Sequence, residues 1–571
     1  MKFARQYWLA PGLLLLLVLN GCSTAHYRRA ADASAYSAIR QKTPLVRNMD
    51  PHFTIEQTNI ISLAGLPLRT NVDEYLGADG ERERNARVLK LEDALDIAVH
   101  HSRSYQFQKE NLYLSALSLA FARHQFTPIF SGNANANYVV QTEQATTLGI
   151  DAITGQPTVI VSDQLVETHS VNGSGSISAS WLIEDLGRVT TAFTADALKF
   201  ITGNSSLTSS SQLSATFLRP LLRDAGFKQE KETLIQAERQ LLYDLRSFTQ
   251  FRKDFSVQIA TAFYNVLGNR DAVRNSFINL ESTRKNAEST RALSAEGRTT
   301  TAELGRYEQA ALVAEAGWIN AIRSYDETLD NFKIQLGLSV ETNVVLDDHE
   351  LEALVIRHPD ISVEDSIKVA LAGRLDFQNV RDELDDTVRQ VDLAANFLKP
   401  QLDLTASGAV VSNPNTTGHP ALPQFNRYNW SAGLALDPGF DRVAERNAYR
   451  SAMIARNRAA RAVELQQDEV IFQVRESWRT LDQARRNYEI SDHSVKLAER
   501  RVEEQDLLAE VGRAKAQDQV DAQNDLISSK NQRTQALVTH TIARLQFWDN
   551  MGILYIKDNG QWEEIQNAKA K

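Results

Sequence analysis

The sequence predicts a mainly α-helical chain with membrane β-structure, built as a duplicated unit of long coiled-coil α-helices plus β-hairpins. Three observations predict this fold class. The chain contains an internal repeat, two long stretches without proline in which apolar residues recur every seven positions, and two blocks in which residue character alternates with a period of two. Periods of seven and two are typical of seam-packed helices and of strands, respectively.

The internal repeat is visible in two alignments without gaps. "LEDALDIAVHHSRSYQ" from Leu91 matches "VEDSIKVALAGRLDFQ" from Val363 at an offset of 272 residues, and the same offset pairs Pro128 with Pro400. At an offset of 215, Gly297 pairs with Gly512, as the following arginines also do. Two unrelated helices would share apolar spacing by chance, but not glycines at the same places. We therefore expect two copies of one structural unit.

Two stretches without proline are predicted to be mostly helix, because proline interrupts helices. They run from Pro220 to Pro359 and from Pro438 to the end of the chain. Within them the apolar residues step by seven, which keeps the seam on one face of a supercoiled helix. The first series is Ile259, Val266, Val273, Leu280 and Ala287, and the second is Val474, Leu481, Tyr488, Val495 and Val502. Residues 229–295 would form roughly 100 Å of helix if it is continuous.

Gly297 and Gly512 are the predicted helix-turn tips, since glycine readily takes the positive φ of a helix C-terminus. Each helix then returns to a second glycine of the repeat, at Gly337 or Gly552.

The segments after Pro128 and Pro400 read as strands rather than helices. Small polar residues alternate there with apolar or small ones, as Ser174, Ser176, Ser178 and Ser180 do with Gly175, Ile177, Ala179 and Trp181. Such strands suit a barrel wall between lipid and water, although a half-buried soluble sheet would look similar. We expect at least one hairpin in each half, and the number of strands in the longer first region stays open. The alternating piece 212–217 either adds a strand or caps the barrel. Single-chain barrels start at eight strands, so several chains would have to share one.

The first residues read as an export signal. Lys2 and Arg5 precede the apolar run Leu13–Leu19, and Gly21 precedes Cys22. "LNGC" resembles the bacterial lipoprotein signal, which implies cleavage before Cys22 and a covalent lipid on that cysteine, with Asn20 an imperfect fit. In the sorting rule of bacterial lipoproteins, a serine after the lipidated cysteine, here Ser23, favours the outer rather than the inner membrane. The alternative is ordinary cleavage after Ala25 without an anchor.

Composition excludes several classes of protein. Cys22 is the single cysteine, so the body of the chain has no disulfide framework and no cysteine metal site. The net charge of −10 argues against a nucleic-acid partner. We find no catalytic motif, so we expect no enzyme, and no motif for a cofactor other than the lipid on Cys22. No metal site is expected either, because the adjacent His100 and His101 point in different directions on a helix.

The whole arrangement resembles the bacterial outer-membrane efflux protein family, the TolC-like outer-membrane factors, over about Leu89 to Ile553. The matching features are the two "LEDALDIAVHHS" and "VEDSIKVALAG" openings, the proline junctions, the "WLIEDLGR" and "GLALDPGFDR" strand exits and the two glycine turns. The resemblance implies a trimeric, shared 12-stranded β-barrel with four strands from each chain, and a periplasmic α-helical tunnel. This sequence departs from the family in its longer first hairpin region and in the segment from Cys22 to about Arg87.

By the same resemblance, "VGRAKAQDQVDA" looks like the periplasmic tip of the tunnel, with Asp518 and Asp521 as the periplasmic gate. Residues three apart lie on one face of a helix, and a threefold axis would bring six carboxylates together. Such a ring would attract cations and select them. The first repeat has Glu303 and Arg306 at these positions, so it lacks the acidic pair. Without the resemblance, the two aspartates read as a solvated helix face.

These inferences divide the chain into consecutive parts: a lipoprotein signal peptide at 1–21, an N-terminal lipid-anchored segment at 22–86, a first efflux repeat at 87–345 with its hairpin region at about 128–220, a second repeat at 346–555 with its hairpin at about 400–438, and a C-terminal tail at 556–571. We expect an exit channel of a tripartite efflux or type I secretion system. The implied partners are two identical copies in a homotrimer, a periplasmic adaptor protein, an inner-membrane transporter and outer-membrane lipid. The alternative is a lipid-anchored periplasmic coiled-coil adaptor or envelope structural protein.

Overall fold

The computed structural model describes residues 23–56, 63–150, 155–202, 207–413, 422–511 and 513–563. The chain divides into two compact units. We call the first the helical unit (Met1–Ala116, Gln240–Glu383 and Ala460–Lys571) and the second the sheet unit (Leu117–Arg239 and Leu384–Ala459). Both units draw on both halves of the sequence, so the boundary between the repeats is not a boundary between units.

Helices make up most of the described chain. They are α2 (Thr24–Lys42), α3 (Leu91–His101), α4 (Arg103–His124), α5 (Lys228–Ala295), α6 (Thr301–Leu336), α7 (His349–Glu352), α8 (Val363–Gly373), α9 (Leu375–Phe397), α10 (Val443–Glu510) and α11 (Ala516–Asn550), with 3-10 turns η1 (Thr43–Leu45) and η2 (Glu74–Glu83). Among the described residues, no helix combines the length and the apolar character needed to cross a membrane.

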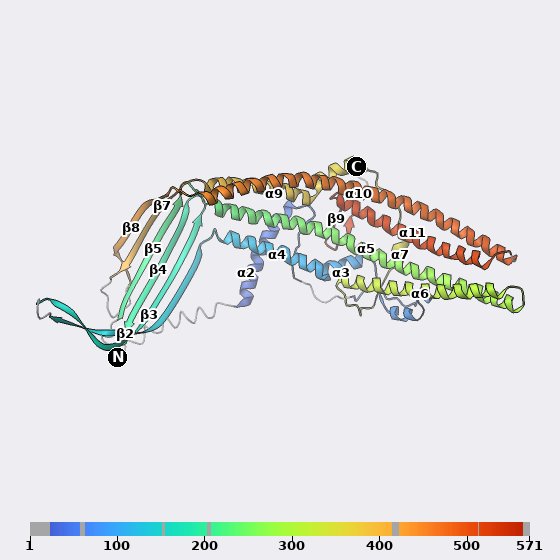
Figure 1. Ribbon diagram of the computed structural model, residues 1–571, viewed down its shortest axis with the longest axis horizontal. Coiled ribbons are helices and arrows are strands. Elements are labelled where there is room, and N and C mark those ends of the chain that lie inside the picture. The colour runs from blue at the N-terminus through green and yellow to red at the C-terminus, as the bar shows by residue number, and fades with distance from the viewer. Residues whose placement is uncertain are drawn as a thin grey trace. The chain divides into compact units, whose positions relative to one another are not determined.

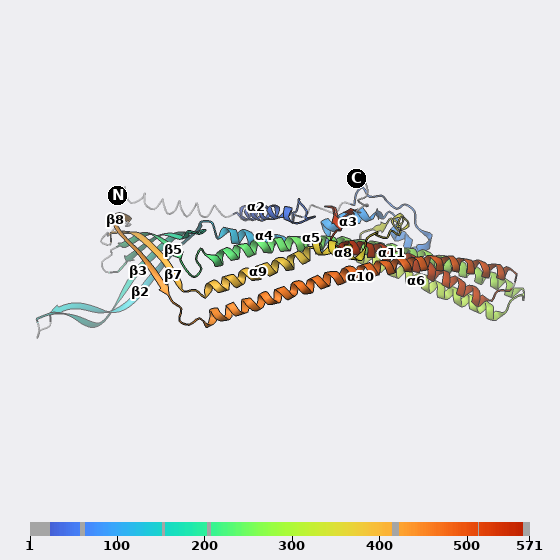
Figure 2. The same cartoon turned by 90° about the horizontal axis from the view of Figure 1, so that it is seen from above.

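The helix bounds agree with the two sequence offsets. Helices α5 and α10 have 68 residues each and begin and end 215 residues apart. Helices α3 and α8 have 11 residues each and lie 272 residues apart. The long helices pair with the helices that return from their turns: Arg291 of α5 contacts Glu308 of α6 at 2.8 Å, and Arg501 of α10 bonds to Asp525 of α11 (Figure 2).

The seven-residue seam forms the core of the helical unit. All five predicted seam residues of α5, from Ile259 to Ala287, are buried, and Val474, Leu481 and Val495 of α10 are buried as well. Around α10 the seam packs against α8, α9 and α11, where Ala370, Phe377 and Phe547 join the same cluster. The seam prediction is therefore confirmed at these positions, and burial of this stripe is what stabilises helices of this length.

One buried arginine of α5 binds residues of the N-terminal segment, between Asp73 and Glu83, and also contacts α6. Arg270 of α5 is 1% exposed. Its Nη2 donates to Asp73 and Glu83, each at 2.7 Å, its Nε donates to the Tyr75 hydroxyl at 2.9 Å, and its Nη1 donates to the Tyr325 hydroxyl at 2.9 Å. Because a buried guanidinium needs partners for its donors, η2 completes this part of the core.

The sheet unit contains one sheet of six antiparallel strands in the order β2-β3-β4-β5-β7-β8. Figure 1 shows the six strands side by side. Their bounds are β2 (Ile129–Ile150), β3 (Pro157–Ile183), β4 (Gly187–Phe200), β5 (Leu207–Pro220), β7 (Gln401–Ser412) and β8 (Pro423–Asp437). Short pairs elsewhere join β1 (Arg87–Leu89) to β6 (Val344–Leu346), and β9 (Tyr555–Ile556) to β10 (Trp562–Glu563).

The chain has more strands than the four that the resemblance implies, because the first half contributes β2 to β5 where one hairpin would contribute two strands. The "WLIEDLGR" motif ends β3 and leads into the next strand, β4. It makes a tight turn between β3 and β4, in which the Leu186 amide donates to the Ile183 carbonyl at 3.2 Å. The open question about residues 212–217 is resolved in favour of a strand, since they lie inside β5. The second motif, "GLALDPGFDR", does lead from β8 into α10.

Candidate functional site

The register of the six-stranded sheet sorts side chains onto two faces. Directly opposed residues share a face and neighbours along a strand alternate, so a row of partners stays on one side across the sheet. One row runs Gly132, Ile177, Phe193, Leu213, Val410 and Tyr428. The adjacent row, on the other face, runs Ser131, Ser178, Ala192, Ser214, Ala409 and Asn429.

The apolar face is uncovered in the single chain. Ile177 is 64% exposed and Trp430 is 75% exposed. Further large side chains on the same face, Phe130, Tyr138 and Leu434, are also exposed. An apolar surface spread over six strands needs a nonpolar environment, because contiguous apolar patches of this kind are rare on soluble monomers.

The opposite face carries hydroxyl and amide groups that bond to one another across the strands. The Ser131 and Ser178 hydroxyl oxygens lie 2.7 Å apart, and those of Ser407 and Ser431 lie 2.8 Å apart. A sheet with one apolar and one hydrogen-bonding face can separate hydrocarbon from water.

The first predicted helix-turn tip lies between the end of α5 and the start of α6. Gly297 has φ 71°. Its amide donates to the Ser294 carbonyl at 3.0 Å, and the Arg298 amide donates to the Leu293 carbonyl at 2.9 Å, which together form a Schellman cap. Thr300 then caps α6 through its hydroxyl, which accepts from the Glu303 amide at 3.2 Å. Gly512 of the second tip lies outside the described residues, as does Cys22.

Asp518 and Asp521 lie in the first two turns of α11, beyond the second tip. Asp518 is exposed. Asp521 is half-buried and accepts from the Gln517 amide at 2.9 and 3.0 Å. The start of α11 is held by its neighbours, because the Tyr307 hydroxyl of α6 donates to Gln519, whose own amide donates to Asp506 of α10 at 3.1 Å.

The first repeat treats its equivalent position differently. The Glu303 carboxylate accepts a hydrogen bond from the Thr299 hydroxyl at 2.6 Å, so it is bonded within the turn that leads into α6. The two repeats therefore differ here: the Asp518 and Asp521 pair lies on α11, and the Glu303 carboxylate bonds within its own turn at the start of α6.

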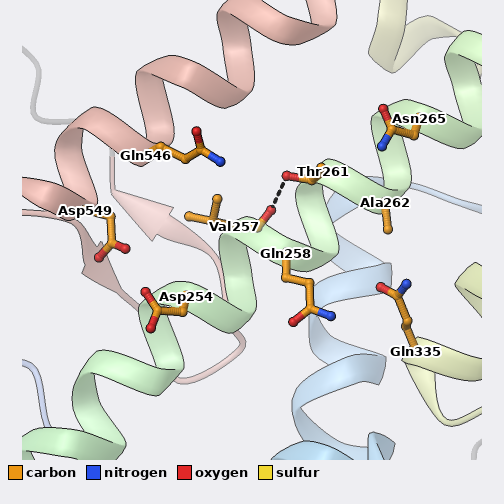
Figure 3. Close-up of a pocket in the computed structure, with 9 residues that line it drawn as sticks. All are labelled: Asp254, Val257, Gln258, Thr261, Ala262, Asn265, Gln335, Gln546 and Asp549. Carbon is orange, nitrogen blue, oxygen red and sulfur yellow. Dashed lines mark hydrogen bonds between the residues drawn. The ribbon is translucent and has the colours of Figure 1, made fainter. Parts of the chain in front are cut away.

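A second polar site, which the sequence did not reveal, is a pocket of about 480 Å³ in the helical unit. It is lined by residues of α5, α6 and α11, namely Asp254, Val257, Gln258, Thr261, Ala262, Asn265, Gln335, Gln546 and Asp549. Figure 3 shows the carboxyl groups of Asp254 and Asp549 pointing toward one another. Gln250 donates to both, at 3.1 Å in each case.

The Asp549 carboxyl of this pocket has a raised pKa. Burial raises the pKa of Asp549 to about 8, and the hydrogen bond and charge of Asp254 add to the rise, whereas Lys253 opposes it. Two adjacent carboxylates cannot both ionise readily in a buried place. No spacing in the sequence could have revealed the pair, since Asp254 and Asp549 are not equivalent positions of the repeat and meet through helix packing.

A group with metal-ligand chemistry lies apart from this pocket. One ligand atom each of Asp50, His52 and Asp558 lies within 4.8 Å of the others. Asp50 accepts from the His52 backbone amide at 2.7 Å, the His52 ring lies 3.9 Å from Asp558, and Asp558 lies 4.0 Å from Arg252. The ligand types fit a divalent cation, but exposed acidic groups of this kind are common without one.

One buried imidazole has an unusual environment. His540 of α11 is 0% exposed, and within the described part of the chain neither ring nitrogen has a hydrogen-bond partner. Burial lowers the pKa of His540 to about 4, and positive charge nearby adds to the effect. The side chain is therefore a neutral core group and cannot serve as a proton carrier near pH 7.

No family model matches the sequence, and no curated protein matches it. Solved structures do match the fold. The CmeC outer membrane channel of Campylobacter jejuni is 12% identical with a TM-score of 0.58, and the match covers 91% of this chain and 96% of that one. The outer membrane protein VceC of Vibrio cholerae is 13% identical with a TM-score of 0.59, covering 81% and 96%.

The open state of the MtrE outer membrane channel of Neisseria gonorrhoeae is similar as well. It is 12% identical, with a TM-score of 0.57, and the match covers 89% of this chain and 95% of that one. The chain therefore has the fold of the TolC-like channels, as the sequence resemblance predicts.

Proposed function

We propose that this protein is an outer-membrane efflux channel, the exit duct through which cargo leaves the cell. The observation that carries the proposal is the sorting of the six-stranded sheet into an uncovered apolar face and a hydrogen-bonding face. The fold shared with CmeC, VceC and MtrE supports it. The apolar face would contact lipid and the polar face would line water.

The chain would reach this state as a homotrimer. Strands β2 and β8 are the two edges of the described sheet, and an open edge is not tolerated in hydrocarbon. Copies of the chain would satisfy these edges by pairing β2 of one copy with β8 of the next. The long helices would then extend into the periplasm as a tunnel.

The tunnel would close at the helix-turn tips. Asp518 and Asp521 would form the periplasmic gate, with six carboxylates around a threefold axis. Like charges gathered at a constriction attract cations and disfavour anions. The predicted helix turns at Gly297 and Gly512 would form the surface that a periplasmic adaptor contacts.

Cys22 would carry the lipid that anchors the trimer in the outer membrane. Its partners would be a periplasmic adaptor and an inner-membrane transporter of a tripartite or type I secretion system. The channel would be passive, so the transporter would supply the energy.

The gate is tested by conductance in planar bilayers under a salt gradient. The double variant Asp518→Ala/Asp521→Ala is expected to move the reversal potential toward zero, because the ring loses its carboxylates. The control Asp79→Ala/Glu81→Ala removes two carboxylates of η2 and should leave it unchanged. An unaltered reversal potential in the Asp518/Asp521 variant would exclude the gate, and absence of any conductance in wild type would exclude the channel.

The anchor is tested by mass spectrometry of the mature N-terminus. A lipid-modified Cys22 as the first residue supports it, and loss of the lipid in Cys22→Ser is the matched control. A mature chain that begins at His26 would instead indicate ordinary signal cleavage.

A further inference from the structure

The first half of the chain contributes a hairpin, β3–β4, that lies in the middle of the sheet. Strand β3 pairs with β2 on one side and with β4 on the other, and β4 pairs with β5 over 12 residue pairs, from Arg188 with Leu218 to Lys199 with Leu207. A central hairpin cannot leave the sheet without breaking the ladders on both of its sides.

The side chains of this hairpin follow the same two-faced pattern as the rest of the sheet. Ile177 and Phe193 oppose one another on the apolar face, flanked by Gly132 of β2 and Leu213 of β5. On the other face Ser176 opposes Thr194. A hairpin that capped a pore from the water side would have no reason to match the apolar face of its neighbours in register.

From these observations we infer that the wall of the channel has eighteen strands, six from each of three copies, and that β3–β4 belongs to the lipid-facing wall. The inference rests on the proposed function, since it takes the trimer from there. Pairing of β8 with β2 of the next copy would close the wall with an even strand number and no free edge.

The strand number sets the width of the lumen. At a spacing of about 4.8 Å and a tilt of about 40°, each strand occupies about 6.3 Å of circumference. Eighteen strands then give a backbone diameter of about 36 Å, against about 24 Å for twelve. The pore through the outer membrane would be about 1.5 times as wide as one built from four strands per chain.

The lumen would also be lined by small polar groups. Its face carries the serine and asparagine side chains of β2 and β3, among them Asn133, Asn135, Ser174 and Ser176. Short side chains fill little of the added width, so the outer-membrane section would not be the narrowest part of the duct. Selection of cargo would then occur elsewhere along the tunnel.

Cryo-electron microscopy of the full-length protein in lipid nanodiscs counts the strands directly. Eighteen strands around a threefold axis, with β3 and β4 in the wall, is the expected result. A trimer with a twelve-stranded wall and β3–β4 outside it would overturn the inference and leave the proposed function standing. A protein that does not enter the nanodisc, or enters it without threefold symmetry, would contradict the proposed function itself.

Spin labels on β3 test the same point without a map. Ile177→Cys and its neighbour Ser178→Cys place a label on opposite faces of one strand. The label at 177 is expected to be relaxed by oxygen dissolved in lipid, and the label at 178 by a water-soluble nickel complex. Accessibility of both labels to the nickel complex would place β3 in water and refute the inference.

A deletion provides the matched variant. Removing residues 151–206 joins β2 to β5 and leaves four strands in the chain. The shortened protein is expected to form a twelve-stranded trimer, with a lumen narrower by about a third. If the shortened chain does not fold, the strand count and the spin labels on the full chain still decide the question.

Discussion

Replacement of Arg270 by methionine should release the N-terminal segment from the long helices. The guanidinium is 1% exposed and donates to Asp73, Tyr75, Glu83 and Tyr325. Methionine keeps much of the volume but leaves the buried carboxylate of Glu83 without its counter-charge. Loss of one partner of a buried ion pair costs about 3–5 kcal/mol.

The free-energy cost of the Arg270→Met replacement can be measured as easier local opening of the N-terminal segment. Amides of this segment, such as those of Asn85 and Val88, donate to the Arg69 and Pro67 carbonyls at 2.9 Å in both cases. If the segment opens more easily by about 3 kcal/mol, hydrogen exchange across residues 63–89 should accelerate by about a hundredfold. Peptide-resolved hydrogen exchange by mass spectrometry reads this directly.

Two controls make the experiment specific. Arg82→Ala removes an exposed arginine of the same segment whose ion pair with Asp326 spans 3.5 Å, and it should change exchange little. Glu83→Gln in the Arg270→Met background should recover part of the protection, because it removes the stranded charge. Unchanged exchange in Arg270→Met, or an equal effect of Arg82→Ala, would refute the reasoning.

Three other expectations follow from single side chains. Gly337→Ala should destabilise the protein strongly, by about 3 kcal/mol or more, because φ is 81° and the added Cβ would lie 2.1 Å from the His101 carbonyl oxygen; a thermal midpoint equal to wild type would contradict it. The pKa of the Asp549 carboxyl is raised from its ordinary 3.8 to about 8 in the folded protein. Because the folded state then holds a proton that the unfolded state loses, wild-type stability should fall as pH rises from 3.8 toward 8. Melting curves of Asp549→Asn should lose most of that slope, and a slope equal to wild type would show that the carboxyl is not its source. The His540 pKa of about 4 lies below its ordinary 6.5, so wild-type stability is fully present above pH 6.5 and should fall by up to about 3 kcal/mol as pH decreases toward 4. In denaturation experiments, the free energy of unfolding of His540→Leu should exceed that of wild type at pH 7 by about 1 kcal/mol and should depend less on pH. A His540→Leu variant less stable than wild type at pH 7 would mean that the imidazole has a hydrogen-bond partner.

Features that depend on local periodicity could be predicted from the sequence. The absence of proline and the seven-residue step identified α5 and α10, and the seam residues from Ile259 to Ala287 are buried as expected. Gly297 was predicted to lie in a turn because glycine readily takes a positive φ at the end of a helix. In the structure Gly297 has a positive φ. These signals are local, so one sequence is sufficient to read them.

Features that depend on how distant segments pair could not be predicted. The resemblance gave "WLIEDLGR" as a strand exit, and the number of strands after it stayed open, because it depends on the pairing of β4 with β5. Asp254 and Asp549 come together only because α5 packs beside α11. Asp518 and Asp521 are on the predicted helix, while the gate itself depends on other copies of the chain and stays a prediction.

The pairing of β5 with β7 has a consequence for biogenesis. These strands are neighbours in the sheet, yet α5, α6, α8 and α9 lie between them in the chain. A polypeptide exported N-terminus first presents β2 to β5 well before β7 arrives, so the β5 edge remains unpaired during that interval. An unpaired apolar edge invites aggregation, and the nascent protein should therefore depend on a periplasmic holdase until its second repeat has been translocated.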